Sequence, residues 1–103
     1  MAEPSILDVA ERARFEIHSG GQPAGYLNYR LARGEIALTH TEIDERRRGQ
    51  GLGGALVRGA LDAARRRRLS VLPECEFAAS WIARHPEYAD LVPATRHPRF
   101  GLA

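Results

Sequence analysis

Apolar and polar residues alternate along three short stretches in the first half of the chain. Residues 14–18, 24–31 and 35–43 each follow a two-residue period, which is typical of β-strands with one buried face. Two glycine-containing turns, Ser19-Gly20-Gly21-Gln22 and Ala32-Arg33-Gly34, separate these stretches. Because short turns join neighbouring antiparallel strands, the pattern predicts a three-stranded antiparallel meander.

The alternation fails near the end of the third predicted strand. With an unbroken two-residue period, Ile36 and Leu38 would share one face with His40 and Glu42. A β-bulge would turn the two polar side chains away from the apolar ones. We therefore predict a bulge near His40 or Thr41.

The pattern becomes helical after residue 50. Between residues 51 and 68 apolar residues recur every three or four positions, which predicts an amphipathic helix. Residues 69–72 form a short apolar run and predict a fourth strand. A strand, a helix and a strand in succession imply a right-handed crossover that places the fourth strand parallel to the third. The sequence thus predicts an α+β fold with helices packed on a four-stranded sheet.

Two further features complete the predicted elements. Residues 74–84 predict a second helix, which His85-Pro86 interrupts because the residue before proline avoids helical geometry. Residues 87–91 add a short helical turn. We expect residues 1–5 and 93–103 to be loose ends of a single domain spanning residues 1–103. The buried side of the second helix is predicted to consist of Phe77, Ala78, Trp81 and Ile82.

Composition places limits on the class of protein. A chain of 103 residues with 44% hydrophobic content suits one small domain. The single cysteine excludes an internal disulfide. The chain has no apolar run of about 18 residues and no recognisable secretion signal, so we expect a cytoplasmic protein with no membrane span. The net charge of +2 is mild, but arginines concentrate at residues 46–48 and 65–68.

Glycines cluster between the third predicted strand and the first predicted helix. Glycine lets the main chain approach a ligand, and a helix start has unpaired N–H groups and a positive dipole end. Arg46, Arg47 and Arg48 add positive charge just before the glycines. The spacing fits neither a Walker motif nor the dinucleotide fingerprint. The segment predicts a seat for a phosphate or another anion, and the alternative is a flexible loop before a well-packed helix.

The glycine segment also resembles a family signature. Arg48-x-x-Gly51-x-Gly53 is similar to the Arg/Gln-x-x-Gly-x-Gly/Ala signature of the GNAT acetyltransferases. Three other segments strengthen this resemblance, namely His40-Thr41-Glu42-Ile43, Val71-Leu72-Pro73-x-Cys75 and Arg84-His85-Pro86-Glu87-Tyr88. Residues 15–92 therefore resemble the short, single-domain GNAT-like N-acetyltransferases.

The resemblance implies a minimal GNAT-like fold that binds acetyl-CoA. It implies that N–H groups of the glycine turn hold the CoA diphosphate. It also implies that the pantetheine arm pairs with the preceding strand, in a cleft between the third and fourth strands. The implied cofactor-binding residues are Thr41, Ile43, Arg46, Arg47, Arg48, Gly49, Gln50, Gly51, Leu52, Gly53 and Gly54.

Three residues are candidates for the chemistry. By the resemblance, the thioester points to the start of the second helix, where Cys75 lies and where the helix dipole favours a thiolate. Cys75 would then protonate the departing CoA sulfur or accept the acyl group itself, and the alternative is a small buried hydrophobe. His40 and Glu42 are candidate bases for an amine, the alternatives being a cross-strand polar pair or a core-bonded His40. We predict no metal, because the histidines and the cysteine lack ligand spacing.

Three functions follow from these residues. The first is acetyl-CoA-dependent acyl transfer to the amine of a small molecule or protein. The second is binding of CoA or acyl-CoA with little or no catalysis. The third, nucleic-acid binding by the arginine runs, is disfavoured because exposed aromatic residues are lacking. The segments that hold acceptors in larger GNAT enzymes are missing, so the acceptor site is open or completed by a second subunit, in a monomer or a homodimer.

Overall fold

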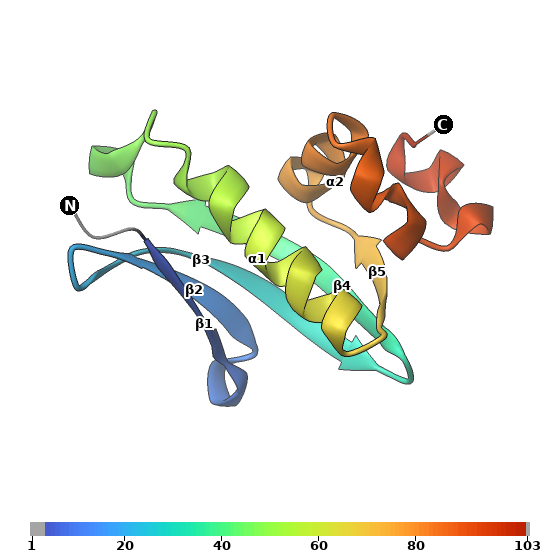
Figure 1. Cartoon of the computed structure of the whole chain (residues 1–103), viewed down its shortest axis with the longest axis horizontal. Coiled ribbons are helices and arrows are strands. Elements are labelled where there is room, and N and C mark those ends of the chain that lie inside the picture. Colours follow the sequence, from blue (N-terminus) through green and yellow to red (C-terminus); the bar gives the residue numbers. More distant parts are fainter. Residues whose placement is uncertain (1–3, 103) are drawn as a thin grey trace.

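The computed structural model describes residues 4–102, and Figure 1 shows α1 crossing the sheet with α2 and the C-terminal turns beside it. The strands within this range are β1 (Ser5–Val9), β2 (Arg14–Ser19), β3 (Gln22–Ala32), β4 (Glu35–Ile43) and β5 (Ser70–Pro73). The α-helices of the same range are α1 (Leu52–Arg66) and α2 (Glu76–Ala83).

One sheet contains the described strands in the order β1-β2-β3-β4-β5. The first four strands are antiparallel neighbours, and β5 pairs in parallel with β4 after the α1 crossover. The predicted α+β fold, with its meander and its parallel fourth strand, is therefore confirmed. The strands predicted at residues 14–18, 24–31, 35–43 and 69–72 correspond to β2, β3, β4 and β5.

The alternation pattern does not predict β1, and Ser5, expected in a loose end, is its first residue. This strand pairs only with β2 at the edge of the sheet, so few of its side chains need to be apolar. Leu7 is 48% exposed, whereas Asp8 accepts a hydrogen bond from the hydroxyl of Tyr29 at 2.6 Å. Residues 1–3 of the predicted loose end lie outside the described residues.

The predicted bulge in β4 is confirmed. The register between β3 and β4 shifts by one residue after Asn28, which faces His40. Thr39 is the extra residue, and its hydroxyl donates a hydrogen bond to the carbonyl oxygen of Asn28 at 3.3 Å. Because a shift of one residue exchanges the two faces of a strand, His40 is exposed instead of joining Leu38 in the core.

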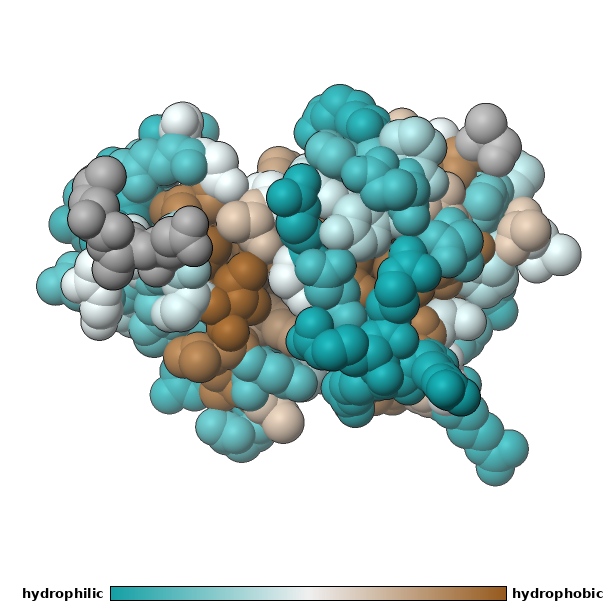
Figure 2. Space-filling view, in the orientation of Figure 1, coloured by the Kyte–Doolittle hydropathy of each residue, from teal (hydrophilic) through white to brown (hydrophobic). Residues whose placement is uncertain are grey.

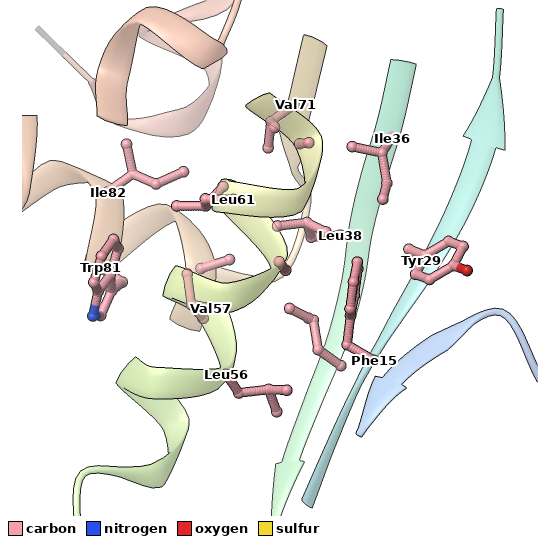
Figure 3. Close-up of a cluster of buried hydrophobic side chains, with 14 of the residues drawn as sticks. Phe15, Tyr29, Ile36, Leu38, Leu56, Val57, Leu61, Val71, Trp81 and Ile82 are labelled. Carbon is pink, nitrogen blue, oxygen red and sulfur yellow. The ribbon is translucent and has the colours of Figure 1, made fainter. Parts of the chain in front are cut away.

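Apolar side chains of α1 and α2 pack onto one face of the sheet. Figure 3 shows Leu56, Val57 and Leu61 of α1 between the strands and α2. Truncating such a buried leucine to alanine costs about 2–5 kcal/mol. The strands and α2 contribute Phe15, Leu27, Ile36, Leu38, Val71, Trp81 and Ile82. Figure 2 shows that the outer side of the helices is mostly hydrophilic, with a hydrophobic strip beside α1 near β1.

The prediction that Phe77 is buried is wrong. Its side chain is 42% exposed, whereas Ala78, Trp81 and Ile82 of the same predicted face are buried. The sequence pattern identifies the side of α2 that turns inward, but the ring of Phe77, in the first turn, lies against Gly53 of α1 outside the core cluster.

The prediction of a loose C-terminal end is also wrong for residues 93–102. Two short 3-10 helices, Ala94–Arg96 and Pro98–Phe100, order this segment, and Leu102 is buried in the common core. The N–H at Nε2 of His97 donates to the carbonyl oxygens of Ala89 and Val92 at 3.1 and 2.9 Å. Pro98 stands at the start of the second turn, a position that suits the fixed φ angle of proline. Residue 103 lies outside the described residues.

Candidate functional site

The main chain just after β4 is already hydrogen-bonded within a 3-10 turn. The side chain of Asp44 accepts from the amide of Arg46 at 3.1 Å. The amides of Arg47 and Arg48 donate to the carbonyl oxygens of Asp44 and Glu45 at 2.9 and 3.3 Å. These three arginine amides are therefore engaged, which narrows the predicted amide seat to the glycine-rich residues that follow.

Asp44 also holds the side chain of Arg46. Nε and Nη2 of the guanidinium donate to the two carboxylate oxygens at 3.3 and 3.2 Å. These bonds, followed by the one from the Arg46 amide, hold the pKa of Asp44 below its ordinary value. The Arg46 side chain is otherwise 89% exposed. Arg46 is therefore already paired with Asp44 inside the turn.

The start of α1 leaves main-chain N–H groups open. Gly49 and Gly51 have φ angles of 84° and 76°, a left-handed conformation that glycine adopts without strain. Gly51 is the N-cap of α1, no side chain caps the helix, and its first turn has no acidic residue. The N–H groups of Leu52 and Gly53 therefore lack helical partners and form the positive end of the helix dipole.

A cavity of about 470 Å³ opens onto this helix start. Its lining consists of Ile43, Arg47, Arg48, Gly49, Gly51, Leu52, Gly53, Gly54 and Phe77. It combines cationic side chains and glycine main chain with the apolar side chains of Ile43, Leu52 and Phe77. Such a lining suits a ligand in which an anionic group is joined to an apolar chain. Of the predicted cofactor-binding residues, Thr41, Arg46 and Gln50 do not contribute to this lining.

Two glycines of α1 make room for aromatic rings of α2. A Cβ atom on Gly53 would lie 2.7 Å from Cζ of Phe77, and one on Gly54 would lie 3.0 Å from Nε1 of Trp81. These glycines therefore have a packing role that their sequence context alone does not show. The signal for it is the four-residue spacing of the two aromatic residues, which places both rings on one side of α2.

Strands β4 and β5 part beyond Leu38. Their parallel pairing ends at Leu38 and Pro73, and the amide of Cys75 then donates to the carbonyl oxygen of Leu38 at 2.9 Å. The chain turns into α2 at this point. Within residues 4–102, the edge of β4 from residue 39 to residue 43 therefore has no strand beside it on the β5 side.

Cys75 contacts Thr41 where the strands part. Its Sγ lies 3.3 Å from Oγ1 of Thr41 and accepts a hydrogen bond from the amide of Ala78 at 3.4 Å. Cys75 is the N-cap of α2, one position before its first turn, whereas the helix predicted over residues 74–84 would include it. The cysteine sulfur thus caps the start of α2 by accepting from one of its unpaired N–H groups.

His40 and Glu42 form an exposed polar pair along β4. Nε2 of His40 lies 3.0 Å from Oε1 of Glu42, and the side chains are 53% and 55% exposed. They point away from the face on which Thr41 meets Cys75, because successive side chains of a strand alternate. The pair lies within one strand, unlike the cross-strand pair considered above, and His40 is not in the core.

The residues after α2 stabilise a packed junction. The N–H at Nδ1 of His85 donates to the carbonyl oxygen of Trp81 at 2.7 Å, and the two rings stack with centroids 3.7 Å apart. The hydroxyl of Tyr88 donates to Asp62 of α1 at 2.9 Å. Burial and then this hydrogen bond raise the pKa of Tyr88. The contacts of His85 and Tyr88 thus stabilise the packing at the junction after α2.

The two arginine runs are far apart. They flank α1, whose 15 residues span roughly 22 Å at 1.5 Å per residue.

In residues 4–102, no helix combines the length and hydropathy needed to cross a membrane. The same residues contain no cluster of three or more histidine, cysteine or acidic side chains arranged to hold a metal ion.

Comparisons with known proteins match most of the chain. Residues 14–91 match the family described as GCN5-related N-acetyl-transferase. The NMR structure of a GCN5-like protein from Staphylococcus aureus shares the fold, with 24% identity, a TM-score of 0.69, and coverage of 90% of this chain and 91% of that one. The crystal structure of Ard1 from Thermoplasma volcanium is 26% identical, covering 57% of this chain and 41% of that one with a TM-score of 0.51. No curated protein matches the chain.

Proposed function

The chain belongs to the GCN5-related N-acetyltransferase family, whose members use acetyl-CoA as co-substrate, and we propose that it transfers the acetyl group of acetyl-CoA to an amine. The acceptor is the amine of a small molecule or of a protein. The residues that carry the proposal lie at the start of α1, along the free edge of β4 and at Cys75.

The open start of α1 is the main support for cofactor binding. It has no side-chain cap and no acid in its first turn, and it faces a cavity lined by Arg47 and Arg48. A helix start of this kind binds phosphate groups through N–H groups and dipole together. We assign the CoA diphosphate to the amides of residues 49–54, with the two arginine side chains as counter-charges.

The free edge of β4 supports the position of the pantetheine arm. Its amide groups can pair with an extended ligand where β5 no longer pairs with the strand. Ile43 lines the cavity at one end of this edge, and Thr41 contacts Cys75 further along it. An arm that follows the edge from Ile43 to Thr41 would bring the thioester next to the cysteine sulfur.

Cys75 supports two routes for the acetyl group. In the first, the amine attacks the acetyl carbonyl, the C–S bond to CoA breaks, and the Cys75 thiol donates its proton to the departing sulfur. In the second, the Cys75 thiolate attacks the carbonyl and CoA leaves as a thiolate that takes up a proton. The amine then attacks the S-acetyl group, and the Cys75 sulfur is the leaving group. Both routes end with an amide and free CoA.

The amine must lose a proton in either route, and we assign this step to the pair His40 and Glu42. Their side chains are exposed on the sheet face opposite the helices, one residue on either side of Thr41. An acceptor approaching from that face would meet the pair before reaching the thioester.

Intact-protein mass spectrometry separates the two routes and tests the proposal. Wild-type protein and a Cys75→Ser variant are mixed with acetyl-CoA, first alone and then with a panel of amines. An acetyl group on wild type alone, which a later amine removes, supports the covalent route. Acetylated amine from both proteins, with no adduct on either, supports direct transfer. Binding of acetyl-CoA without any acetylated amine would exclude transfer to the amines of the panel.

That last outcome would favour a second function, the binding of CoA or acyl-CoA with little or no catalysis. One observation favours this alternative. Strands β2 and β3 are joined by the tight turn at Gly20 and Gly21, and within residues 4–102 no strand lies beyond β5. The described residues thus form the part of the site that would bind the cofactor, and few of them would enclose an acceptor. Protection of Cys75 from iodoacetamide by acetyl-CoA, without turnover, would support this function.

A further inference from the structure

Phe77 is an apolar residue whose exposure the packing of the protein does not explain. It is one of three large hydrophobic side chains exposed among residues 4–102, together with Leu7 and Leu31. Its neighbour one turn later in α2, Trp81, is only 5% exposed although both rings lie against consecutive glycines of α1. The same type of seat thus leaves one ring covered and the other 42% exposed.

The ring of Phe77 is held in a defined position. Three of its carbon atoms, Cζ, Cε2 and Cε1, lie 2.7, 3.1 and 3.5 Å from the place where a Cβ of Gly53 would be. The ring therefore rests directly on the main chain of the first turn of α1. This contact fixes an apolar surface beside the N–H groups to which we assign the diphosphate.

The uncovered part of the ring lines the cavity at the start of α1. Ile43 and Leu52 are the other large apolar side chains of this lining, and Arg47 and Arg48 supply its positive charge. A nucleotide diphosphate alone would use the charges and the amides but not the apolar side chains. Coenzyme A would use both, because a branched hydrocarbon segment of the pantetheine arm follows its diphosphate directly.

We propose that Phe77 is a specificity residue that binds the pantetheine arm and so distinguishes CoA thioesters from nucleotides that lack the arm. The proposal rests on the function proposed above. The ring covers the apolar segment of the arm, while the glycine amides and arginines hold the diphosphate. Burying part of a phenyl ring against a hydrocarbon segment strengthens binding through the apolar area removed from water.

The test measures two ligands on matched variants by isothermal titration calorimetry. The ligands are CoA and 3′-phosphoadenosine 5′-diphosphate, which is CoA without its pantetheine arm. The variants are Phe77→Ala, Phe77→Leu and, as a control, Leu31→Ala. Leu31 is similarly exposed, but it pairs with Ile36, at the opposite end of β4 from Ile43. Melting temperatures establish that each variant is folded.

We expect Phe77→Ala to weaken CoA binding about tenfold and to change binding of the armless nucleotide less than about twofold. Phe77→Leu should restore most of the CoA affinity, and Leu31→Ala should change neither ligand. An equal loss for both ligands would overturn the inference, because the ring would then only support the amide seat. Unchanged CoA binding in Phe77→Ala would also overturn it. If wild type binds neither ligand, the cofactor assignment itself is wrong, which is a separate result.

Discussion

Both ends of α1 carry an arginine run. The two ends differ in the partners that the protein itself provides for the groups at each end of the helix. At the C-terminal end, Arg65 forms a double hydrogen bond with Asp90 at 2.8 and 3.0 Å, and Arg67 lies 3.7 Å from Asp8. At the N-terminal end, the first turn has neither a capping side chain nor an acid. One end of the helix is closed by internal partners, and the other is open onto a cavity.

This difference shows that positive charge alone does not distinguish the proposed cofactor site from the other end of α1. Arg46 and Arg47 both lie within ion-pair distance of Asp44, at 3.2 and 3.9 Å, yet only Arg47 lines the cavity. The open main-chain groups of α1 distinguish the N-terminal end better than the arginine count does. Because unsatisfied N–H groups favour an anion, we expect changes at the two ends to affect different properties of the protein.

The largest effect should come from Gly51→Glu. The new carboxylate would stand at the positive end of α1 and repel the diphosphate, so acetyl-CoA affinity should fall at least about a hundredfold in calorimetry. Gly34→Glu is the matched control, because Gly34 also has a positive φ, of 65°, and has open space around its Cα. Equal losses in the two variants would mean that backbone strain, rather than charge at the helix start, controls binding.

The next effect concerns the closed end, where Asp8 joins Tyr29 to Arg67. Burial and then the hydrogen bond to Asp8 raise the pKa of Tyr29 from 10.0 to about 12. The neutral phenol therefore stabilises the fold below pH 10, and this contribution is lost as pH rises toward 12.

Chemical denaturation at several pH values would measure this loss. Between pH 10 and 12, the free energy of unfolding should fall on the order of 2 kcal/mol further in wild type than in Tyr29→Phe. Tyr26→Phe is the control and should keep the wild-type pH dependence. Identical pH profiles for wild type and Tyr29→Phe would show that Tyr29 does not cause the loss of stability.

A smaller effect is expected from Arg47→Ala at the open end. Its side chain is 25% exposed and lines the cavity, so its loss should weaken acetyl-CoA binding about fivefold at low salt. The difference from wild type should shrink as ionic strength rises. A fivefold loss that is independent of salt would indicate that Arg47 acts through packing.

The smallest effect should come from Arg65→Ala. This change removes an exposed ion pair with Asp90, so the melting temperature should fall by about 2 °C, and less in high salt. Binding of acetyl-CoA should stay unchanged, in contrast to Arg47→Ala. Weaker binding in Arg65→Ala would contradict the division of roles between the two helix ends.

Local patterns in the sequence were sufficient for most of the fold. The alternation in residues 14–43, the helical period of α1 and the short apolar run of β5 depend on neighbours close in the chain, and the structure confirms them. The bulge at Thr39 was also predictable, because His40 and Glu42 would otherwise interrupt an apolar face.

The missed features depend on contacts between distant segments. Strand β1 contains the acidic Asp8 because the hydroxyl of Tyr29 satisfies it from two strands away. Phe77 lies against Gly53 of α1 and lines a cavity there, and no pattern in α2 records this contact. The engagement of the Arg46 amide by Asp44 required a specific turn geometry. The sequence predicted that β4 pairs with β5, but it did not predict the residue at which the two strands separate.

That point of parting has a consequence for the behaviour of the protein in solution. An unpaired strand edge is a template for intermolecular β-pairing, and natural proteins normally cover or charge such edges. Residues 39–43 of β4 form an edge of this kind on the β5 side. A ligand that lies along it would occupy the same main-chain groups that a second molecule would use. We therefore expect preparations depleted of CoA to aggregate sooner on storage than preparations saturated with it.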